Sequence, residues 1–445
     1  MRGWLGAPIM EAISRIAPGH PPGKGVGWSE SSGRSRRRWL EDRGGSGTTG
    51  VEGSQGRSRL NDDELLALVR RLPSRLEPLR ELLLANLVMI SEIPSPTFGE
   101  ERRVEFIKQR FTECGLDTPS SDEMGNAVAV LPGEEGGRSI LLSAHVDTPF
   151  AETVPHAVAL TPGEATGPGV ADNSLGVAVL ATLPTILERL GIRLQSDLVL
   201  LGSTRSLGRG NLEGLRFYLA HRRHQPVAGI SVEGAQLGRV HYASLAALGG
   251  EILLQEGEGA PRDGKGVSPG VIPALGRLIG ELQARIGETG GDLSLILGMV
   301  EGGTSHKVPA QSAALRFMAR SGSDRELDRA RDAIESLIGA ISGREGVHYR
   351  FDPFARSRAG GLADDHPLVL NARRILTALG VPPELGCCSS AVSTFLEHGV
   401  PALAIGMAHA RHLNQPNETV EIDTLQKGVA QLIGILLAID GGACD

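Results

Sequence analysis

Short apolar runs that alternate with helical stretches are the feature of this sequence that most limits its fold. Four runs have the length and the Val, Ile and Leu content of buried strands: NAVAVLP, SILLSAHVDT, DLVLLGSTRS and AGISVEGA. Stretches with helical periodicity lie between them, ADNSLGVAVLATLPTILERLG and GNLEGLRFYLAHRR. Strands that alternate with helices in this way predict an α/β fold with a mostly parallel sheet.

The alternation is interrupted once, over residues 246–358. Here the strand-like runs are GGEILLQEGEG, SAALRFMARS and VHYRFDPFARS, and the helical ones are IPALGRLIGELQARIG and DRELDRARDAIESLIGAI. This pattern predicts a small α+β domain at 246–358, inserted into an α/β domain made of 59–245 and 359–445. A chain of 445 residues is long enough for two or three domains.

Residues 1–58 differ in composition from the rest of the chain. They are rich in Gly, Ser, Arg and Pro and have no apolar period, so they predict a disordered tail. Glu11 and Arg15 interrupt the first apolar stretch, which argues against a signal peptide. The basic run at 34–38 is interpreted as part of a solvated tail rather than as a targeting or binding patch. A third interpretation is that the start codon is assigned too far upstream. Order is predicted to begin at Asn61, which would cap a helix with acidic residues in its first turn.

Composition excludes several functions. The net charge of −7 argues against nucleic-acid binding. The sequence has no uninterrupted apolar run of membrane-spanning length, and the last one, LIGILLAI, is short enough to be core, so no membrane span is predicted. Four cysteines are too few for a disulfide framework, and no second pair accompanies Cys387 and Cys388 to bind zinc. A reducing, cytoplasmic location is expected.

Three motifs place chemically useful side chains after apolar runs. SILLSAHVDT delivers His145 at its carboxyl end, and Asp147 is spaced to fix the tautomer of that imidazole. Asp172 stands in a Gly-rich loop before a helix, where the alternative is an ordinary N-cap. In AGISVEGA the apolar strand is predicted to end at Glu233, where the alternative is an ordinary turn acid. In open α/β sheets such carboxyl ends meet at the ligand-binding edge.

Taken in order, the motifs resemble one family, that of the co-catalytic zinc aminoacylases, acetylornithine deacetylases and glutamate carboxypeptidases. The resemblance covers residues 85–440 and rests on IPSPTFGEE, AHVDTP, GVADNSLGVA, SVEGAQLGRVHYASLAALGG, GGTSHKVPAQSAALRFMARS and HGVPALAIG…NQPNETVEID. It implies an α/β zinc domain interrupted by a smaller α+β lid, here 246–358, that usually forms a homodimer. It also implies that one zinc ion is held by His145, Asp172 and Glu233.

A second zinc ion is expected in that family, and this chain departs from the pattern there. The second ion would share Asp172, and its other two ligand positions fall on Ser206 and Asn414. The general-base position falls on Arg205, which stays protonated and cannot accept a proton. The resemblance therefore implies one retained zinc and a lost second ion and base. We hypothesise that the Arg205 guanidinium fills the vacated space and pairs with Asp172 or with a carboxylate of a ligand.

Other positions bear on the same interpretation. Three family residues that normally contact substrate or support the site are replaced, at Pro261, at His306 or Lys307, and at Ala391. Two histidines close to Asn414 could reach the site if their loop shifts, although surface loop histidines are the favoured interpretation: His409 and His412. GAPRDGKG imitates a phosphate loop but lacks the following Ser or Thr, and CCSSAVST offers no base for a serine nucleophile.

The sequence thus predicts a hydrolase-like protein. The ancestral reaction implied by the resemblance is zinc-dependent hydrolysis of a C–N bond in a small peptide or an N-acyl amino acid, and the chain is predicted to be a degenerate pseudoenzyme candidate. The alternatives are an active one-metal hydrolase of divergent specificity, and a non-catalytic homologue that binds peptides or amino acids or regulates a partner.

Overall fold

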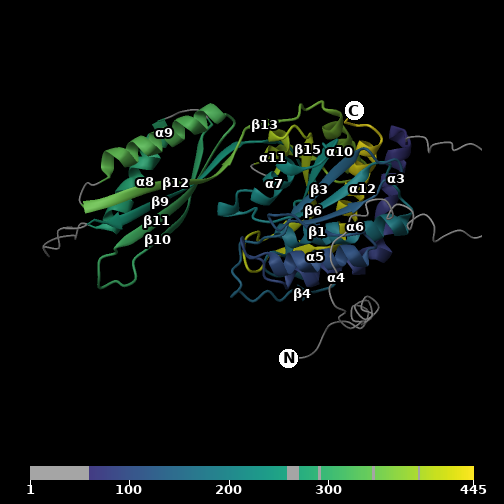
Figure 1. Cartoon of the computed structure of the whole chain (residues 1–445), viewed down its shortest axis with the longest axis horizontal. Coiled ribbons are helices and arrows are strands. Elements are labelled where there is room, and N and C mark those ends of the chain that lie inside the picture. Colours follow the sequence, from purple (N-terminus) through teal and green to yellow (C-terminus); the bar gives the residue numbers. More distant parts are fainter. Residues whose placement is uncertain (1–59, 258–269, 289–291, 343–345, 389–390, 445) are drawn as a thin grey trace, which may run out of the picture.

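Two units make up the fold, a large α/β unit and the lid (Figure 1). The computed structural model describes residues 60–257, 270–288, 292–342, 346–388 and 391–444. The predicted tail at 1–58 lies outside these residues. The prediction of a mostly parallel α/β domain with a smaller α+β domain is confirmed.

The large unit is built on one sheet with the order β1-β2-β6-β3-β7-β15-β8-β13, and β14 also pairs with β8. Its inner strands β6, β3, β7 and β15 are parallel to one another, whereas β2 runs antiparallel to β1 and β6. Strand β8 runs antiparallel to β15 and β13 and parallel to β14. The strands are β1 Ser120–Ser121, β2 Ala127–Leu131, β3 Ser139–His145, β6 Asp197–Ser203, β7 Ala228–Ala235, β8 Arg239–Ser244, β13 Gly360–Gly361, β14 Glu384–Cys388 and β15 Ala402–Ala408.

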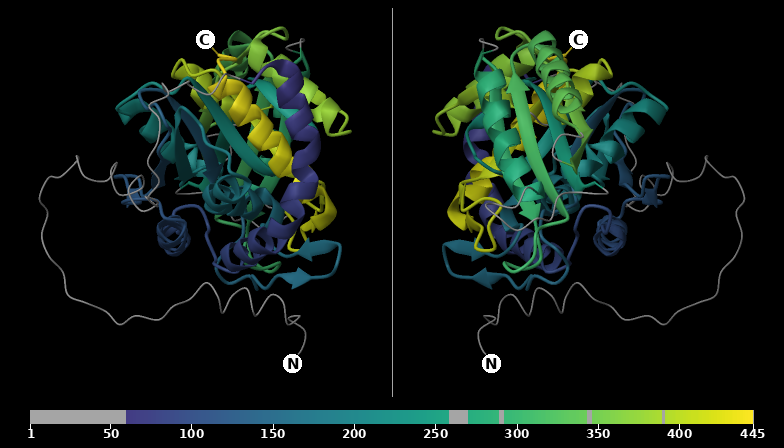
Figure 2. Two further views of the ribbon diagram at one scale, coloured as in Figure 1. Left: turned by 90° about the vertical axis from the view of Figure 1, so that its right-hand side faces the viewer. Right: turned by 90° about the vertical axis from the view of Figure 1, so that its left-hand side faces the viewer.

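Helices cover both faces of this sheet. One face carries α3 Asp62–Leu76, η1 Glu77–Leu79, α4 Arg80–Ser91, α5 Glu101–Glu113, α6 Gly176–Leu190, α10 Pro367–Ala378, η5 Ile422–Thr424 and α12 Leu425–Asp440. The other carries α7 Glu213–His221 and α11 Ala391–Glu397. The first and last of these helices, α3 and α12, lie side by side although they come from opposite ends of the chain (Figure 2). Asn61 caps α3 as predicted, since its side chain accepts from the Glu64 amide.

The lid has its own sheet and core. Strands β9 Ala246–Glu256, β10 Ser294–Gly302, β11 Ser312–Ser321 and β12 Val347–Ser357 form an antiparallel sheet in the order β10-β11-β9-β12. Helices α8 Val271–Glu288 and α9 Asp324–Ile341 pack on it around a cluster that includes Leu254, Leu278 and Ile334. Strand β10 was not predicted. It lies at the sheet edge and is exposed along much of its length, with Leu295 and Leu297 half-buried against the lid core.

A small third sheet, in the order β16-β17-β5-β4, closes one end of the large unit. Its strands are β4 Ala159–Leu160, β5 Glu164–Thr166, β16 Ala410–Arg411 and β17 Thr419–Glu421. The pairing of β17 with β5 matters for function, because it brings the segment after residue 410 against the segment that leads to Asp172.

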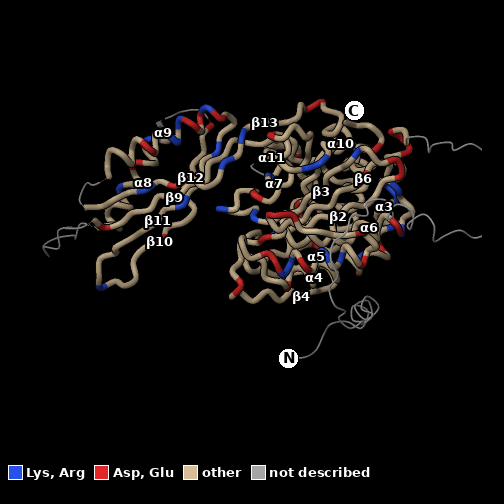
Figure 3. The backbone as a smooth tube through the Cα atoms, viewed as in Figure 1, with Lys and Arg blue, Asp and Glu red and all other residues tan. Residues whose placement is uncertain are grey.

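Arg209 links the two units. It lies in the short turn η3 Gly208–Gly210 of the large unit. Its guanidinium pairs with Glu251 of β9 and, at 2.7 Å, with Asp352 of β12, and it lies 4.9 Å from the centre of the Phe354 ring. Elsewhere, acidic and basic residues are interspersed along both units (Figure 3).

Two helical segments, Val170–Leu190 and Ile422–Asp440, are long and apolar enough to cross a membrane. The final helical segment, Ile422–Asp440, is therefore longer than the run LIGILLAI from which no membrane span was predicted. However, the most apolar windows of the two segments are 89% and 78% buried inside the fold. Both segments form the core against the central sheet.

Close packing of α12 on β15 yields a stability prediction. A Cβ at Gly428 would lie 1.8 Å from the Met407 carbonyl oxygen, so Gly428→Ala should lower the free energy of unfolding by about 1–3 kcal/mol or more. Gly276→Ala in α8 is the matched control, because its Cβ would meet nothing within 4 Å; it should stabilise by about 0.5–1 kcal/mol. Denaturant unfolding of both variants checks this, and equal effects would contradict the packing argument.

Candidate metal centre

Three side chains from separate segments converge at the carboxyl edge of the parallel strands. His145 is the last residue of β3, Glu233 lies near the end of β7, and Asp172 lies in the irregular turn η2 Val170–Leu175 before α6. One potential ligand atom from each lies within 4.8 Å of the others. In the described part of the chain, this is the group of His, Cys, Asp or Glu side chains placed to hold a metal ion.

The imidazole of His145 is held between carboxylates. Its Nε2 lies 3.0 Å from an Asp172 oxygen and 4.0 Å from a Glu233 oxygen. Its Nδ1 lies 3.0 Å from the backbone oxygen of Asp147 and 3.4 Å from a carboxylate oxygen of the same residue. Because β3 ends at His145, Asp147 lies beyond the strand. Its contacts nevertheless orient Nε2 toward Asp172 and Glu233.

Asp147 is itself fully buried and hydrogen-bonded. One carboxylate oxygen accepts from the Thr97 hydroxyl at 2.8 Å and from the backbone amides of Ser206 and Leu207 at 2.9 and 2.8 Å. The orientation of His145 therefore depends on the loop after β6.

Asn173 joins the Asp172 segment to β7. Its side-chain amide donates to the Val232 carbonyl and its side-chain oxygen accepts from the Gly234 amide, both at 2.8 Å. Val232 and Gly234 flank Glu233, so one side chain fixes the position of two candidate ligands. Position 234 must be glycine, because a Cβ there would lie 1.9 Å from the Ala171 carbonyl oxygen.

The charges of the cluster shift its pKa values. Burial opposes protonation of His145, but hydrogen bonds to Asp147 and Asp172 outweigh it and raise the pKa of the imidazole well above its usual range. Burial disfavours ionisation of Asp147 and Asp172, yet contact with His145 lowers the pKa of both. The pKa of Glu233 is raised, chiefly by burial.

A buried arginine lies beneath the site. Arg103 is fully buried and donates to the carbonyls of Ile93 and Val146 and to the Ser174 hydroxyl. Burial lowers its pKa to about 9, although nearby Asp147 acts in the opposite direction. It therefore ties three segments together, two through backbone carbonyls and one through the Ser174 hydroxyl.

The positions expected to hold a second ion are arranged differently. Arg205 pairs with Glu213 at 3.2 Å and its guanidinium lies 5.8 Å from the centre of the Phe98 ring. In this structure the Arg205 guanidinium therefore has Glu213, eight residues further along the chain, as its ion-pair partner, where the hypothesis had placed Asp172. The Arg205 amide instead donates to the buried carboxylate of Glu100 at 2.7 Å.

The remaining predicted positions contribute no further ligand to the group. Ser206 is buried with its hydroxyl 3.5 Å from that of Ser203, and Asn414 is exposed. His409 and His412 are exposed and lie outside the ligand group.

The predicted lid positions lie away from the group or outside the description. Pro261 is outside the described residues. His306 and Lys307 are exposed in the turn between β10 and β11. Ala391 is buried at the first residue of α11.

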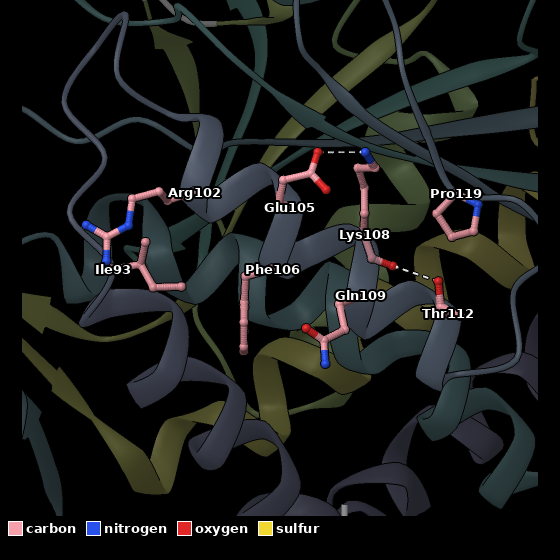
Figure 4. Close-up of a pocket in the computed structure, with 8 residues that line it drawn as sticks. All are labelled: Ile93, Arg102, Glu105, Phe106, Lys108, Gln109, Thr112 and Pro119. Atoms are coloured by element: carbon pink, nitrogen blue, oxygen red, sulfur yellow. Dashed lines mark hydrogen bonds and ion pairs between the residues drawn. The ribbon is translucent and has the colours of Figure 1, made fainter. Parts of the chain in front are cut away.

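A separate pocket lies away from this site. It has a volume of about 540 Å³ and lies on the outer side of α5, lined by residues that include Arg102, Phe106, Lys108 and Pro119 (Figure 4). Its lining contains none of the predicted site residues.

Glu418 was missed by the sequence analysis. It is fully buried, and its carboxylate accepts from the amides of Ala171, Asp172 and Asn414. The available signal was an acid between Asn417 and the β-branched pair that begins β17, inside the quoted motif NQPNETVEID. Burial raises the pKa of Glu418.

Comparison with known proteins now gives the family. The model of peptidase family M20/M25/M40 matches residues 141–438. The chain belongs to this family. A search of curated protein sequences found no match.

Solved structures of M20 peptidases share the fold. Aminopeptidase PepT from Bacillus cereus is 16% identical, with a TM-score of 0.60, and the match covers 81% of this chain and 98% of that one. Human carnosine dipeptidase 1 is 11% identical, with a TM-score of 0.67 and coverage of 84% and 99%. The YXEP protein of Bacillus subtilis, titled a dinuclear metal-binding peptidase of family M20, is 16% identical, with a TM-score of 0.52 and coverage of 82% and 98%.

The raised pKa of His145 predicts pH-dependent metal binding. In the metal-free protein, stability from the charged imidazole is complete below its usual pKa of 6.5 and is lost as pH rises through the higher folded pKa. A metal ion must displace that proton, so zinc affinity should rise with pH from about 6 to about 8. Competition with a chelator at several pH values measures this. His221→Ala, an exposed control, should leave the profile unchanged, and a flat wild-type profile would contradict the prediction.

Proposed function

We propose that this M20 family member is a degenerate C–N bond hydrolase that holds one zinc ion and lacks the second. Family membership supports hydrolysis of a peptide or N-acyl amino acid as the ancestral reaction. The observation that carries the proposal is the contrast between two sets of positions: His145, Asp172 and Glu233 converge, whereas positions 205, 206 and 414 provide no comparable group.

The donor set fits a divalent cation. One imidazole nitrogen and two carboxylates are ordinary zinc ligands, and they come from rigid strand ends and a braced turn. The carboxyl groups of Asp147, Asp172, Glu233 and Glu418 lie near one another, with His145 and Arg103 as cationic groups beside them. Such an excess of buried acid favours a bound cation.

The chemistry then divides between the ion and the chain. A bound zinc would supply Lewis-acid polarisation of a substrate carbonyl. Asp147 orients the imidazole, and Asn173 sets the spacing between the Asp172 and Glu233 segments. Arg205 cannot accept a proton from water, and loss of a general base typically lowers the rate by about 10²–10⁴-fold.

Metal stoichiometry is the decisive measurement. Elemental mass spectrometry on protein purified without chelator or metal-binding tag should give one zinc per chain, and His145→Ala should remove it. Two ions per chain would contradict the loss of the second site and implicate His409 or His412. No ion, even after zinc is added back, would favour a non-catalytic binding protein.

Restoring the replaced positions tests the assignment of the second site. The triple variant Arg205→Glu, Ser206→Glu, Asn414→His should bind a second ion, because it returns an acid pair and an imidazole around the shared Asp172. The double variant without Asn414→His is the control and should bind the second ion more weakly. A triple variant that still binds one ion would contradict the assignment of these positions.

A substrate screen separates a degenerate protein from an active one-metal hydrolase. The related structures are titled a dipeptidase, a tripeptidase and an aminopeptidase, so dipeptides, tripeptides and N-acyl amino acids are the compounds to test. Turnover that depends on His145 would establish the active alternative.

We also propose that the chain forms a homodimer through the edge of its lid. Strand β10 lies at a sheet edge and exposes Ile296, Met299 and Val300, at 45%, 40% and 55%. An exposed apolar edge strand favours pairing with another copy. Burial of the two apolar helices supports a soluble protein, for which we propose the cytoplasm.

A charge on this edge should separate the protomers. Val300→Asp should shift the mass measured by light scattering from dimer to monomer. Val130→Asp is the control, because Val130 is 40% exposed on β2 of the other unit, and it should leave the mass unchanged. A wild-type monomer at micromolar concentration would contradict the proposal.

A further inference from the structure

We propose that Glu418 is a positioning residue that fastens the Asp172 segment and the Asn414 loop into one rigid wall of the metal site. This inference rests on the proposed function for the identity of the bound ion. Its geometry stands on the chain alone. One oxygen of the Glu418 carboxylate accepts from the amides of Ala171 and Asp172 at 3.0 and 3.2 Å. The other oxygen accepts from the Asn414 amide at 2.7 Å.

The backbone amides of Ala171 and Asp172 need a hydrogen-bond acceptor from outside their own segment. The backbone of Asp172 is not helical, with φ −114° and ψ 92°, so its amide and that of Ala171 precede the regular ladder of α6. Ala171 is fully buried, and a buried amide without an acceptor is costly. The Glu418 carboxylate serves both amides, and it thereby fixes the backbone from which the Asp172 side chain projects.

The small third sheet delivers Glu418 to this place. Thr419 pairs with Thr166 in the β17–β5 ladder, and the Gly167 amide donates to the Glu418 carbonyl at 2.9 Å. The chain from 164 to 172 is therefore held along its length by residues 418–421. The contact joins positions 247 residues apart in the sequence.

Asn414 contacts Glu418 through its main chain. Asn414 has a φ of 62°, and its amide rather than its side chain reaches Glu418. The Glu418 amide donates back to the Gln415 carbonyl at 3.0 Å, which closes the turn. Position 414 is therefore held through its main chain, and Glu418 aligns the candidate ligand Asp172 with the vacated ligand position.

A purely structural role predicts a different result from a positioning role. If Glu418 only supports the fold, its loss lowers stability and leaves metal affinity unchanged. If it positions Asp172, its loss also weakens metal binding, since partners that orient metal ligands typically contribute about 10–100-fold in affinity.

Asp440 provides a matched control. Its carboxylate likewise accepts from two consecutive backbone amides, those of Gln195 and Ser196, both at 2.8 Å. These amides lie just before β6 begins at Asp197, whereas the site lies at the opposite end of the strands. Asp440→Asn thus removes the same kind of contact far from the site.

The first experiment titrates Zn²⁺ alone into the full-length metal-free protein at neutral pH. We expect Glu418→Gln to weaken zinc binding at least ten-fold and Asp440→Asn to change it less than two-fold, while both lower the thermal midpoint. Zinc affinity of Glu418→Gln within two-fold of wild type would overturn the positioning role. Wild-type protein that binds no zinc would refute the proposed function, and the second experiment then decides on Glu418 alone.

The second experiment measures amide hydrogen exchange without metal. Glu418→Gln should speed exchange in peptides covering 169–176 and 410–416 together, by ten-fold or more, with no change around 195–203. Asp440→Asn should give the reverse pattern. If only one of the two segments loosens in Glu418→Gln, or neither does, then Glu418 does not join them and the inference fails.

Discussion

The buried carboxylate of Asp147 is the contact on which the rest of the site depends. It faces Nδ1 of His145 on one side and accepts two backbone amides from the loop after β6 on the other. The direction of the imidazole is therefore set by the path of that loop and not by β3 alone. Because Arg103 fixes the Val146 carbonyl between the two residues, His145 and Asp147 have little freedom to move apart.

Much of the fold could be predicted because its strands are buried on both faces. The runs that became β3 and β7 are mostly apolar or small residues, and Asn61 stands three residues before the acid that completes its capping box. Strand β10 gave a weaker signal, since it is an edge strand exposed along much of its length, and its core contacts come from the half-buried Leu295 and Leu297.

The candidate site was predictable only in part, for a physical reason. His145, Asp172 and Glu233 carry side chains whose chemistry is visible in the sequence, and a resemblance placed them together. Glu418 and Asn173 act on backbone amides and carbonyls, which every residue possesses, so their roles leave little trace in the local sequence beyond the motif around Glu418. The partner of Arg205 was also beyond prediction, because it depends on where α7 places Glu213 after the chain turns.

The loop that contains Arg205 and Ser206 is held by contacts that do not involve their side chains. Backbone bonds join Arg205 to Glu213 and Ser206 to Leu212, Glu100 and Asp147 accept the amides of the two residues, and Arg209 anchors the following turn to the lid. The backbone contacts that hold Arg205 and Ser206 in place thus do not depend on which side chains stand at these two positions. A lineage could exchange the side chains there and keep most contacts of the scaffold, as the proposed loss of the second ion and the base requires. The same independence makes this loop a favourable place to install a new activity by design.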